Sequence, residues 1–287
     1  MQEEQRQADF PPANLDRATV AGFGREWSHF TQAELGQHER EAILADYFAV
    51  FPWERLPPGG GIGADIGCGS GRWASLIAPR AAHLHLVDAS HEALQVARAN
   101  LSGVSNVSFH RASVEDLPFP DASLDFAYSL GVFHHVPDTR AAILAVARKL
   151  KRGAPLLLYL YYAFDNRPTW FRLLWRASDY VRRLISRMPW GARYWISQAM
   201  AVLVYWPLAR AARLLDRRGR LPSAWPLAYY RDRSFYVMRT DAIDRFGTRL
   251  EQRFTRAEIG QMLRMAGFAD IRFSETPPYW CAAAVKE

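Results

Sequence analysis

The sequence predicts an α/β fold: a doubly wound, mostly parallel sheet with a helical insertion after its fifth strand. Three observations support this prediction. Short apolar runs alternate with helical periodicity from Gly61 to Tyr162. A capping box and two further strand-like runs begin at Thr255. Between these two regions lies a segment rich in arginine and tryptophan, whose composition differs from the rest of the chain.

The expected elements follow one another in the order of a doubly wound sheet. The fifth apolar run, PLLLYLYY, is typical of a parallel strand that is buried on both faces. Thr255 and Glu258 open a last helix to about Ala266, with Gly267 as its stop. The expected strands are 61–66, 83–87, 107–110, 124–128, 155–162, 271–273 and 280–285, and the expected earlier helices are 72–79, 91–101 and 139–150.

Charge and composition divide the chain into four segments. The stretch 165–256 holds nineteen arginines, no lysine and seven acidic residues, a net charge of +12 against +7 for the whole chain. It also carries six of the ten tryptophans. We therefore expect an N-terminal helical segment (1–60), an α/β core (61–164), a basic-aromatic insertion (165–254) and a C-terminal part of the core (255–287).

The general composition is that of a globular protein, with 49% hydrophobic and 23% charged residues. Met1 to Asp16 is polar and lacks the apolar run of a signal peptide. The two cysteines, Cys68 and Cys281, lie in separate motifs and predict no disulfide framework. These features predict a cytoplasmic location.

The strongest local motif is the glycine-rich segment DIGCGSG between Asp65 and Gly71. Its glycines let the backbone turn tightly after a strand and approach a ligand at a helix N-terminus. The spacing is GxGxG, whereas a dinucleotide site has GxGxxG. Asp88 follows about twenty residues later, at the end of the second expected strand, where an acid can accept both ribose hydroxyls. A structural turn and a helix cap are the competing interpretations, but together the two features predict a nucleoside site.

These ordered motifs resemble those of the class I S-adenosylmethionine-dependent methyltransferases, above all the group typified by ubiquinone and menaquinone biosynthesis enzymes. Residues 65–71 resemble the family's first motif, and 87–88 resemble its ribose-binding acid. Residues 111–119 resemble its adenine-contacting segment, 129–138 the segment after strand four, and 150–154 the turn into strand five. Ser113 departs from the family, which often has aspartate there. The resemblance covers about 61–162 and, more loosely, 255–287. It implies S-adenosylmethionine as cofactor, held by Asp65, Gly67, Gly69, Gly71, Asp88, Ser113, Val114, Ser129 and Leu130.

Two adjacent histidines, His134 and His135, are the candidate catalytic residues. Methyl transfer from a sulfonium is an in-line displacement, so alignment of the acceptor does much of the work. A hydroxyl acceptor also needs a base to remove its proton. The competing interpretation is a structural histidine that packs under the cofactor, since the family often carries histidine at the second position even where no base is required. No third ligand keeps metal-site spacing with them, so no metal is predicted.

The insertion predicts two or three helices over 167–220. Its longest apolar stretch, 196–208, has about a dozen residues, and a membrane span needs about 20. Three interpretations stay open: a helical cap with arginines on its solvated face, an interfacial element on an anionic membrane, and a nucleic-acid surface, the least favoured. The first two are compatible and would suit a lipid-like acceptor.

The predicted function is methyl transfer to oxygen, nitrogen or carbon of a small or lipid-like metabolite. Its rivals are a nicotinamide-dependent oxidoreductase, disfavoured by the GxGxG spacing, and a membrane-associated nucleoside-binding protein without catalysis. In related enzymes the residues before the first motif often fold over the cofactor, so the resemblance implies that segment 1–60, with Trp27 and Phe30, covers cofactor or substrate. Ordinary helix packing of these two residues is the alternative. A polar-aromatic cluster is a further candidate for the acceptor side, namely Tyr229, Tyr230, Arg231, Arg239, Asp241, Asp244 and Arg245.

Overall fold

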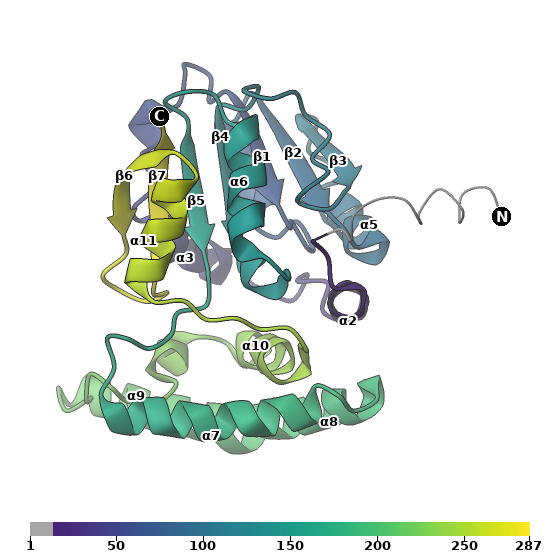
Figure 1. Cartoon of the computed structure of the whole chain (residues 1–287). Coiled ribbons are helices and arrows are strands. Elements are labelled where there is room, and N and C mark those ends of the chain that lie inside the picture. Colours follow the sequence, from purple (N-terminus) through teal and green to yellow (C-terminus); the bar gives the residue numbers. More distant parts are fainter. Residues whose placement is uncertain (1–13) are drawn as a thin grey trace.

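A seven-stranded sheet forms the centre of the computed structural model, which describes residues 14–287 (Figure 1). The strand order is β3-β2-β1-β4-β5-β7-β6. The first five strands run parallel, β7 is antiparallel to β5, and β6 is antiparallel to β7. The segment predicted to lack a signal peptide lies outside the described residues, apart from its last three. The strands are β1 (Ile62–Ile66), β2 (His83–Asp88), β3 (Val107–Arg111), β4 (Phe126–Leu130), β5 (Pro155–Tyr159), β6 (Phe268–Phe273) and β7 (Cys281–Lys286).

Helices cover both faces of the sheet. On one face α6 and α11 pack against Leu156 and Leu158, and on the other α3, α4 and α5 share a core with Leu157. Because strand side chains alternate between faces, the all-apolar fifth strand supplies both cores. These helices and the N-terminal one are α2 (Arg17–His29), α3 (Gln37–Phe48), α4 (Ala74–Ile77), α5 (His91–Asn100), α6 (Thr139–Lys149) and α11 (Arg256–Met265), with short 3-10 turns η1 (Trp53–Arg55), η2 (Ala78–Arg80) and η3 (Phe133–His135).

Two strands differ from their expected bounds. The fourth begins at Phe126 instead of residue 124, because Leu124 forms only an isolated bridge with Leu150. The fifth ends at Tyr159 instead of residue 162, because the chain turns away toward the insertion and Tyr162 pairs with Phe254. In both strands the apolar run in the sequence includes residues that do not pair with a neighbouring strand of the sheet.

Two other boundaries also differ. The helix expected over 72–79 is a short α4 followed by η2, which contains Pro79 in its first turn. Proline cannot donate the backbone hydrogen bond that would continue an α-helix. The sixth strand begins at Phe268, immediately after Gly267, whose positive φ of 78° ends α11. The capping box of Thr255 and Glu258 is present as predicted.

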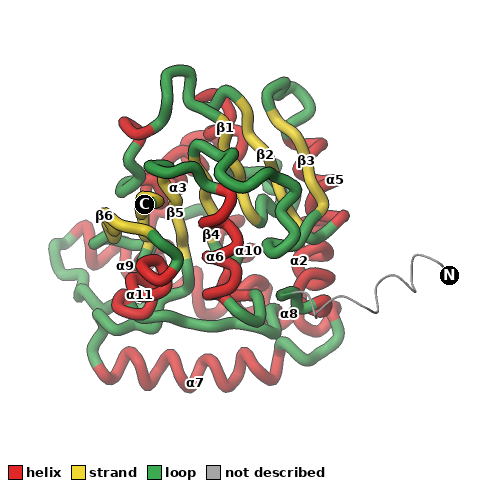
Figure 2. The backbone as a smooth tube through the Cα atoms, turned by 45° about the horizontal axis from the view of Figure 1, so that its top comes forward, coloured by secondary structure: helices red, strands yellow, loops and turns green. Residues whose placement is uncertain are grey.

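The chain between β5 and α11 forms a helical layer at the carboxyl edge of the parallel strands. In both views α7 lies on the far side of α10 from the sheet (Figure 1, Figure 2). A third core cluster, with Met238 and Phe246 of α10, holds the layer together. Among residues 14–287 no helix is long and apolar enough to cross a membrane. The elements are α7 (Thr169–Ile185), α8 (Trp190–Met200), the π-helical η4 (Ala201–Tyr205), α9 (Trp206–Arg217), η5 (Ala228–Asp232) and α10 (Phe235–Gly247).

Candidate active site

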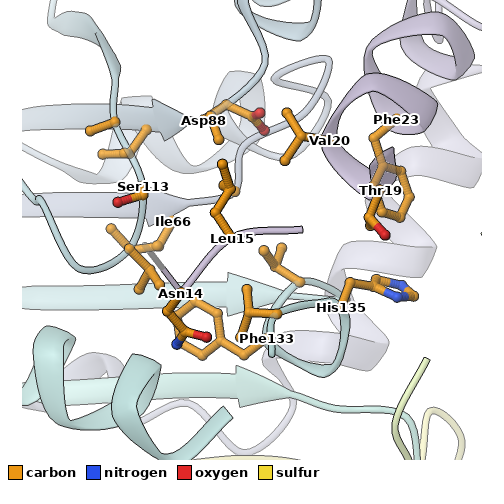
Figure 3. Close-up of a pocket in the computed structure, with 18 of the residues that line it drawn as sticks. Asn14, Leu15, Thr19, Val20, Phe23, Ile66, Asp88, Ser113, Phe133 and His135 are labelled. Carbon is orange, nitrogen blue, oxygen red and sulfur yellow. The ribbon is translucent and has the colours of Figure 1, made fainter. Parts of the chain in front are cut away.

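A cavity lies at the carboxyl ends of β1, β2, β3 and β4 (Figure 3). This is the edge at which open α/β sheets bind their ligands. The N-terminal segment and α2 form its opposite wall. The lining residues are Asn14, Leu15, Thr19, Val20, Phe23, Trp27, Ile66, Gly67, Val87, Asp88, Ala89, Ala112, Ser113, Val114, Leu130, Gly131, Val132, Phe133, His135 and Val136.

The glycine loop turns sharply out of β1 into the cavity. Gly67 has a φ of 80°, and a Cβ added there would lie 2.4 Å from a methyl of Val132. The backbone N–H groups of Gly67 and Cys68 both donate to the Val87 carbonyl, at 2.7 and 3.0 Å. The first glycine is therefore required by backbone conformation and by close packing of the loop after β4.

Asp88 lies at the end of β2 and faces the cavity (Figure 3). Its Oδ2 accepts a hydrogen bond from Gly69 N at 2.9 Å, and its Oδ1 accepts one from Ser90 N at 2.8 Å. Burial raises the pKa of Asp88, and these backbone donors oppose that shift. The N-cap of α5 is Ser90, so Asp88 is not the capping residue. Since a carboxylate has about four acceptor positions, two remain for a ligand.

Four of the residues expected to hold the cofactor lie behind the cavity wall and do not line it: Asp65, Gly69, Gly71 and Ser129. Asp65 is buried and accepts a hydrogen bond from the Tyr128 hydroxyl at 3.0 Å, and burial raises its pKa to about 8. Ser129 donates to the Ile66 carbonyl at 2.8 Å. Gly71 packs against α5, where a Cβ would lie 2.9 Å from Leu101. These four residues hold the glycine loop and its surroundings in shape and do not themselves face the cavity.

The remaining expected residues, Ser113, Val114 and Leu130, line the cavity together with Gly67 and Asp88. The N-terminal segment opposite them was expected to cover cofactor or substrate, but Asn14, which holds this strap in place, was not singled out from the sequence. Asn14 donates to the Asp138 carbonyl at 2.6 Å and accepts from Asp138 N at 2.6 Å, while its own N–H donates to Glu115 at 2.8 Å. These bonds fasten the N-terminal segment to the loops after β3 and β4. No local sequence signal marks a contact between residues more than a hundred positions apart.

The N-terminal helix α2 covers the glycine loop. Trp27 lines the cavity and packs on Gly69, where a Cβ would lie 2.9 Å from the indole. Phe30, the other aromatic of this segment considered from the sequence, is buried in the core against Tyr194 and Tyr236. Of the two interpretations, covering the site holds for Trp27 and helix packing holds for Phe30.

The two candidate histidines have different surroundings. His135 lines the cavity, and its Nδ1 lies 2.6 Å from the Leu250 carbonyl oxygen. A carbonyl only accepts, so Nδ1 carries the proton and Nε2 of the neutral ring has a free lone pair. Within residues 14–287 this buried Nε2 has no hydrogen-bond partner. His134 is fully buried away from the cavity, stacks on Tyr161 at 3.8 Å and accepts from the Tyr161 N–H.

Asp244 faces the free nitrogen of His135. Its Oδ1 lies 3.9 Å from His135 Nε2, and its Oδ2 accepts a short hydrogen bond from the Tyr161 hydroxyl. Burial lowers the pKa of His135, while the Asp244 carboxylate acts in the opposite direction. Within the described chain no group of three histidine, cysteine or acidic side chains is placed to hold a metal ion.

The polar-aromatic cluster expected on the acceptor side is only partly assembled. None of its seven residues lines the cavity. Tyr230 donates to Asp241 at 2.8 Å, and Asp244 approaches the cavity through His135. The three arginines bind elsewhere: Arg231 to Asp216, Arg239 to Gln198 and Arg245 to Glu251.

Comparisons with known proteins agree with the geometry. The family model described as a methyltransferase domain matches residues 64–158. The ubiquinone biosynthesis O-methyltransferase of Xanthomonas axonopodis pv. citri is 28% identical over 223 residues, 77% of this chain and 88% of that protein. Residues 64–158 of the chain form a methyltransferase domain. An uncharacterized methyltransferase of Bacillus subtilis is 41% identical over 104 residues, 36% of this chain and 41% of that protein. A putative methyltransferase of Bacillus halodurans is similar in structure, with a TM-score of 0.47, 18% identity, and 80% of this chain and 70% of that one covered.

The range matched by the methyltransferase model includes the strands that end at the cavity. The family match runs from β1 to β5 and includes β1 to β4, the strands at whose carboxyl ends the cavity lies. Residues of the N-terminal strap and of the segment after α10 complete the site from outside the matched range. The oxidoreductase and the non-catalytic binding protein considered from the sequence are therefore not supported.

Proposed function

We propose that this methyltransferase transfers a methyl group from S-adenosylmethionine to a protic acceptor whose proton His135 removes. The observation that carries the proposal is the environment of His135: the residue lines the cavity, and its buried Nε2 has a free lone pair because Nδ1 is bonded to a carbonyl. A general base needs this geometry before its pKa matters.

The cavity fits the cofactor. The glycine loop brings backbone close to the ligand at Gly67, and Asp88 retains two acceptor positions for the two ribose hydroxyls. Ser113 and Val114 line the side where the family contacts adenine, and Leu130 follows β4. When bound, S-adenosylmethionine supplies an electrophilic methyl on its sulfonium. The protein must exclude water and align the acceptor, and Trp27 and the Asn14 strap close the side that the sheet leaves open.

The proton path proposed for the acceptor ends at His135. Nε2 takes the proton, and the resulting imidazolium keeps its Nδ1–H bond to the Leu250 carbonyl. The Asp244 carboxylate, 3.9 Å away, stabilises that positive charge. Asp244 is thus a positioning residue that acts through His135. An oxygen acceptor suits this arrangement, because a hydroxyl must lose its proton to become a nucleophile. The name of the Xanthomonas relative, an O-methyltransferase, supports the same choice.

The first test of this proposal is cofactor binding. S-adenosylhomocysteine should bind in calorimetry, and Asp88→Ala should weaken it at least roughly tenfold, because each hydrogen bond to a charged group contributes about 1.5–3 kcal/mol. NADH should not bind either form. Binding of NADH without S-adenosylhomocysteine would overturn the proposed cofactor, and unchanged affinity in Asp88→Ala would remove Asp88 from the site.

The second test concerns Asp244. In Asp244→Asn the acid limb of the kcat/KM profile should move to lower pH, because the charge that favours protonated His135 is gone while the amide oxygen still accepts from Tyr161. The activity is measured with methyl-labelled S-adenosylmethionine and a panel of phenols, catechols and amines. Asp241→Asn is the matched control, since Asp241 binds Tyr230 and is not among the groups that shift the pKa of His135. An unmoved acid limb in Asp244→Asn would show that Asp244 is only structural.

A further inference from the structure

One surface of the insertion exposes large apolar side chains to solvent. Sixteen large hydrophobic residues are exposed in the described chain, and twelve of them fall between residues 170 and 214. Single exposed hydrophobics are ordinary on a protein surface, but a set gathered on adjacent helices marks an interaction site. We call ten of them the apolar face: Trp170, Leu173, Leu174, Val181, Leu184, Trp195, Val202, Leu203, Trp206 and Leu214.

The orientation of α7 shows that this face is not the inner surface of a lid. A helix that packs on a core normally turns its apolar stripe inward. In α7 the buried residues are Asp179, Arg182 and Ile185, while Leu173 and Leu174 are 57% and 52% exposed. Arg182 donates to Asp179 at 2.6 Å and to the Thr248 carbonyl at 2.8 Å. The helix is therefore held to the protein by Asp179 and Arg182 together with Ile185, and it presents Leu173 and Leu174 outward.

The other helices of the layer also expose large apolar side chains. Trp195 on α8 is 71% exposed and Leu203 on η4 is 73% exposed, and Trp206 begins α9. In Figure 1 these helices form the layer farthest from the sheet, running across the molecule beneath α10. A set of helices side by side presents a broad surface, whereas a peptide-binding groove would be narrow and concave.

Charge around the apolar face indicates its occupant. Eight exposed arginines lie on α7 and α9 or just beyond their C-terminal ends, and within residues 14–287 six of them form no ion pair: Arg172, Arg176, Arg187, Arg217, Arg218 and Arg220. A second copy of the chain would bring these like charges together, which disfavours a dimer through this face. Anionic headgroups would neutralise them while tryptophan and leucine enter the lipid boundary.

We propose that the apolar face binds the surface of an anionic bilayer, with α7, α8 and α9 lying in the interface plane. The apolar face is the side of the insertion away from the sheet, and the cavity lies at the carboxyl edge of the sheet on the other side of this layer. A methyltransferase bound in this way meets acceptors that partition into lipid. The surface is separate from the cofactor site, so its test does not depend on turnover.

The test is sedimentation of the full chain with vesicles of phosphatidylglycerol and phosphatidylcholine, compared with phosphatidylcholine alone. The protein should sediment with the anionic vesicles and remain largely soluble with the neutral ones. Raising the salt from about 0.1 M to about 1 M shortens the Debye length from about 10 Å to about 3 Å and should release much of the bound protein. No sedimentation with anionic vesicles at the lower salt concentration would overturn the proposal.

Substitutions locate the contact. Trp195→Glu and Leu203→Glu should each reduce vesicle partitioning roughly tenfold, because a carboxylate would have to enter the lipid boundary. Both side chains are highly exposed, so the melting temperature and the affinity for S-adenosylhomocysteine should stay unchanged. Met265→Glu, on the exposed side of α11, is the matched control and should bind vesicles normally. Equal binding by all three variants would overturn the assignment of the face.

Two other results would identify a different occupant and also overturn the proposal. A concentration-dependent dimer in analytical ultracentrifugation that Leu203→Glu abolishes would show that a second copy covers the face. Retention of the protein by a single-stranded oligonucleotide that the same substitution abolishes, with no vesicle binding, would show a nucleic-acid surface.

Discussion

Replacing His135 with asparagine should lower the rate of methyl transfer to a hydroxyl acceptor by roughly 10²–10⁴-fold, the usual contribution of a positioned general base. The asparagine amide lies near the position of Nδ1 and can still donate to the Leu250 carbonyl, so the local fold should hold. What it lacks is a basic nitrogen at the position of Nε2. Affinity for S-adenosylhomocysteine, measured by calorimetry, should remain close to that of the unaltered protein.

The dependence of the rate on pH also follows from the pKa of His135. His135 acts as a base only when neutral, and burial lowers its pKa below the ordinary value of about 6.5. The rate should therefore stay near its maximum at neutral pH and fall only as the pH drops through that lowered pKa. In His135→Asn this acid limb should disappear from the residual activity.

A neighbouring residue provides the control. His134→Asn keeps an acceptor for the Tyr161 N–H and removes a side chain that does not reach the cavity. It should reduce stability through lost packing but change the rate by only a few-fold. If His134→Asn abolished activity and His135→Asn did not, the assignment of the base would be wrong.

The cofactor side of the site could be predicted from the sequence because its signals are local. Gly67 and Asp88 each follow a strand at a fixed offset, and backbone conformation or strand position accounts for both. The sequence did not separate the residues that line the cavity from those behind it. Asp65 and Gly71 belong to the same motif as Gly67, yet one bonds Tyr128 and the other packs on α5.

The acceptor side could not be predicted in the same way, because its contacts join distant residues. The proton on His135 is fixed by Leu250, which is 115 positions away, and the strap depends on Asn14 and Asp138, 124 positions apart. A pattern along the chain carries no information about such pairs. The strand expected at 124–128 is present at 126–130, and its bounds differ for a related reason: an apolar run does not show which of its residues will find a neighbouring strand.

The surroundings of the arginines in the insertion could not be predicted from the sequence either. As a cap, the segment was expected to turn them to solvent, but Arg182 is 3% exposed. Its surroundings are acidic: Arg182 pairs with Asp179 at 2.6 Å and approaches Glu251 at 4.0 Å. Glu251 also accepts from Arg245 and Arg253, at 2.8 Å each, and its side chain is 1% exposed. A buried ionic cluster thus joins α7 to the segment that contacts His135.

Glu251→Ala should therefore destabilise the protein by about 3–5 kcal/mol, because removing one partner of a buried ion pair leaves the other charges uncompensated. Chemical denaturation measures the loss as a lower transition midpoint. Glu275→Ala is the matched control: Glu275 pairs with Arg256 at the same 2.8 Å, but its side chain is 68% exposed. That substitution should cost at most about 1 kcal/mol, as surface ion pairs do.

The dependence of this loss on pH follows from the pKa of Glu251. Burial alone would raise that pKa, but Arg253, Arg245 and Arg182 outweigh burial and hold it below its usual range. A carboxylate whose pKa is depressed in the folded state contributes stability above its unfolded pKa of about 4.3, and this contribution is lost as the pH falls through the folded pKa. The difference between the unaltered protein and Glu251→Ala should be full at neutral pH and should shrink in acid. A difference that did not change with pH would show that Glu251 acts through packing and not through its charge.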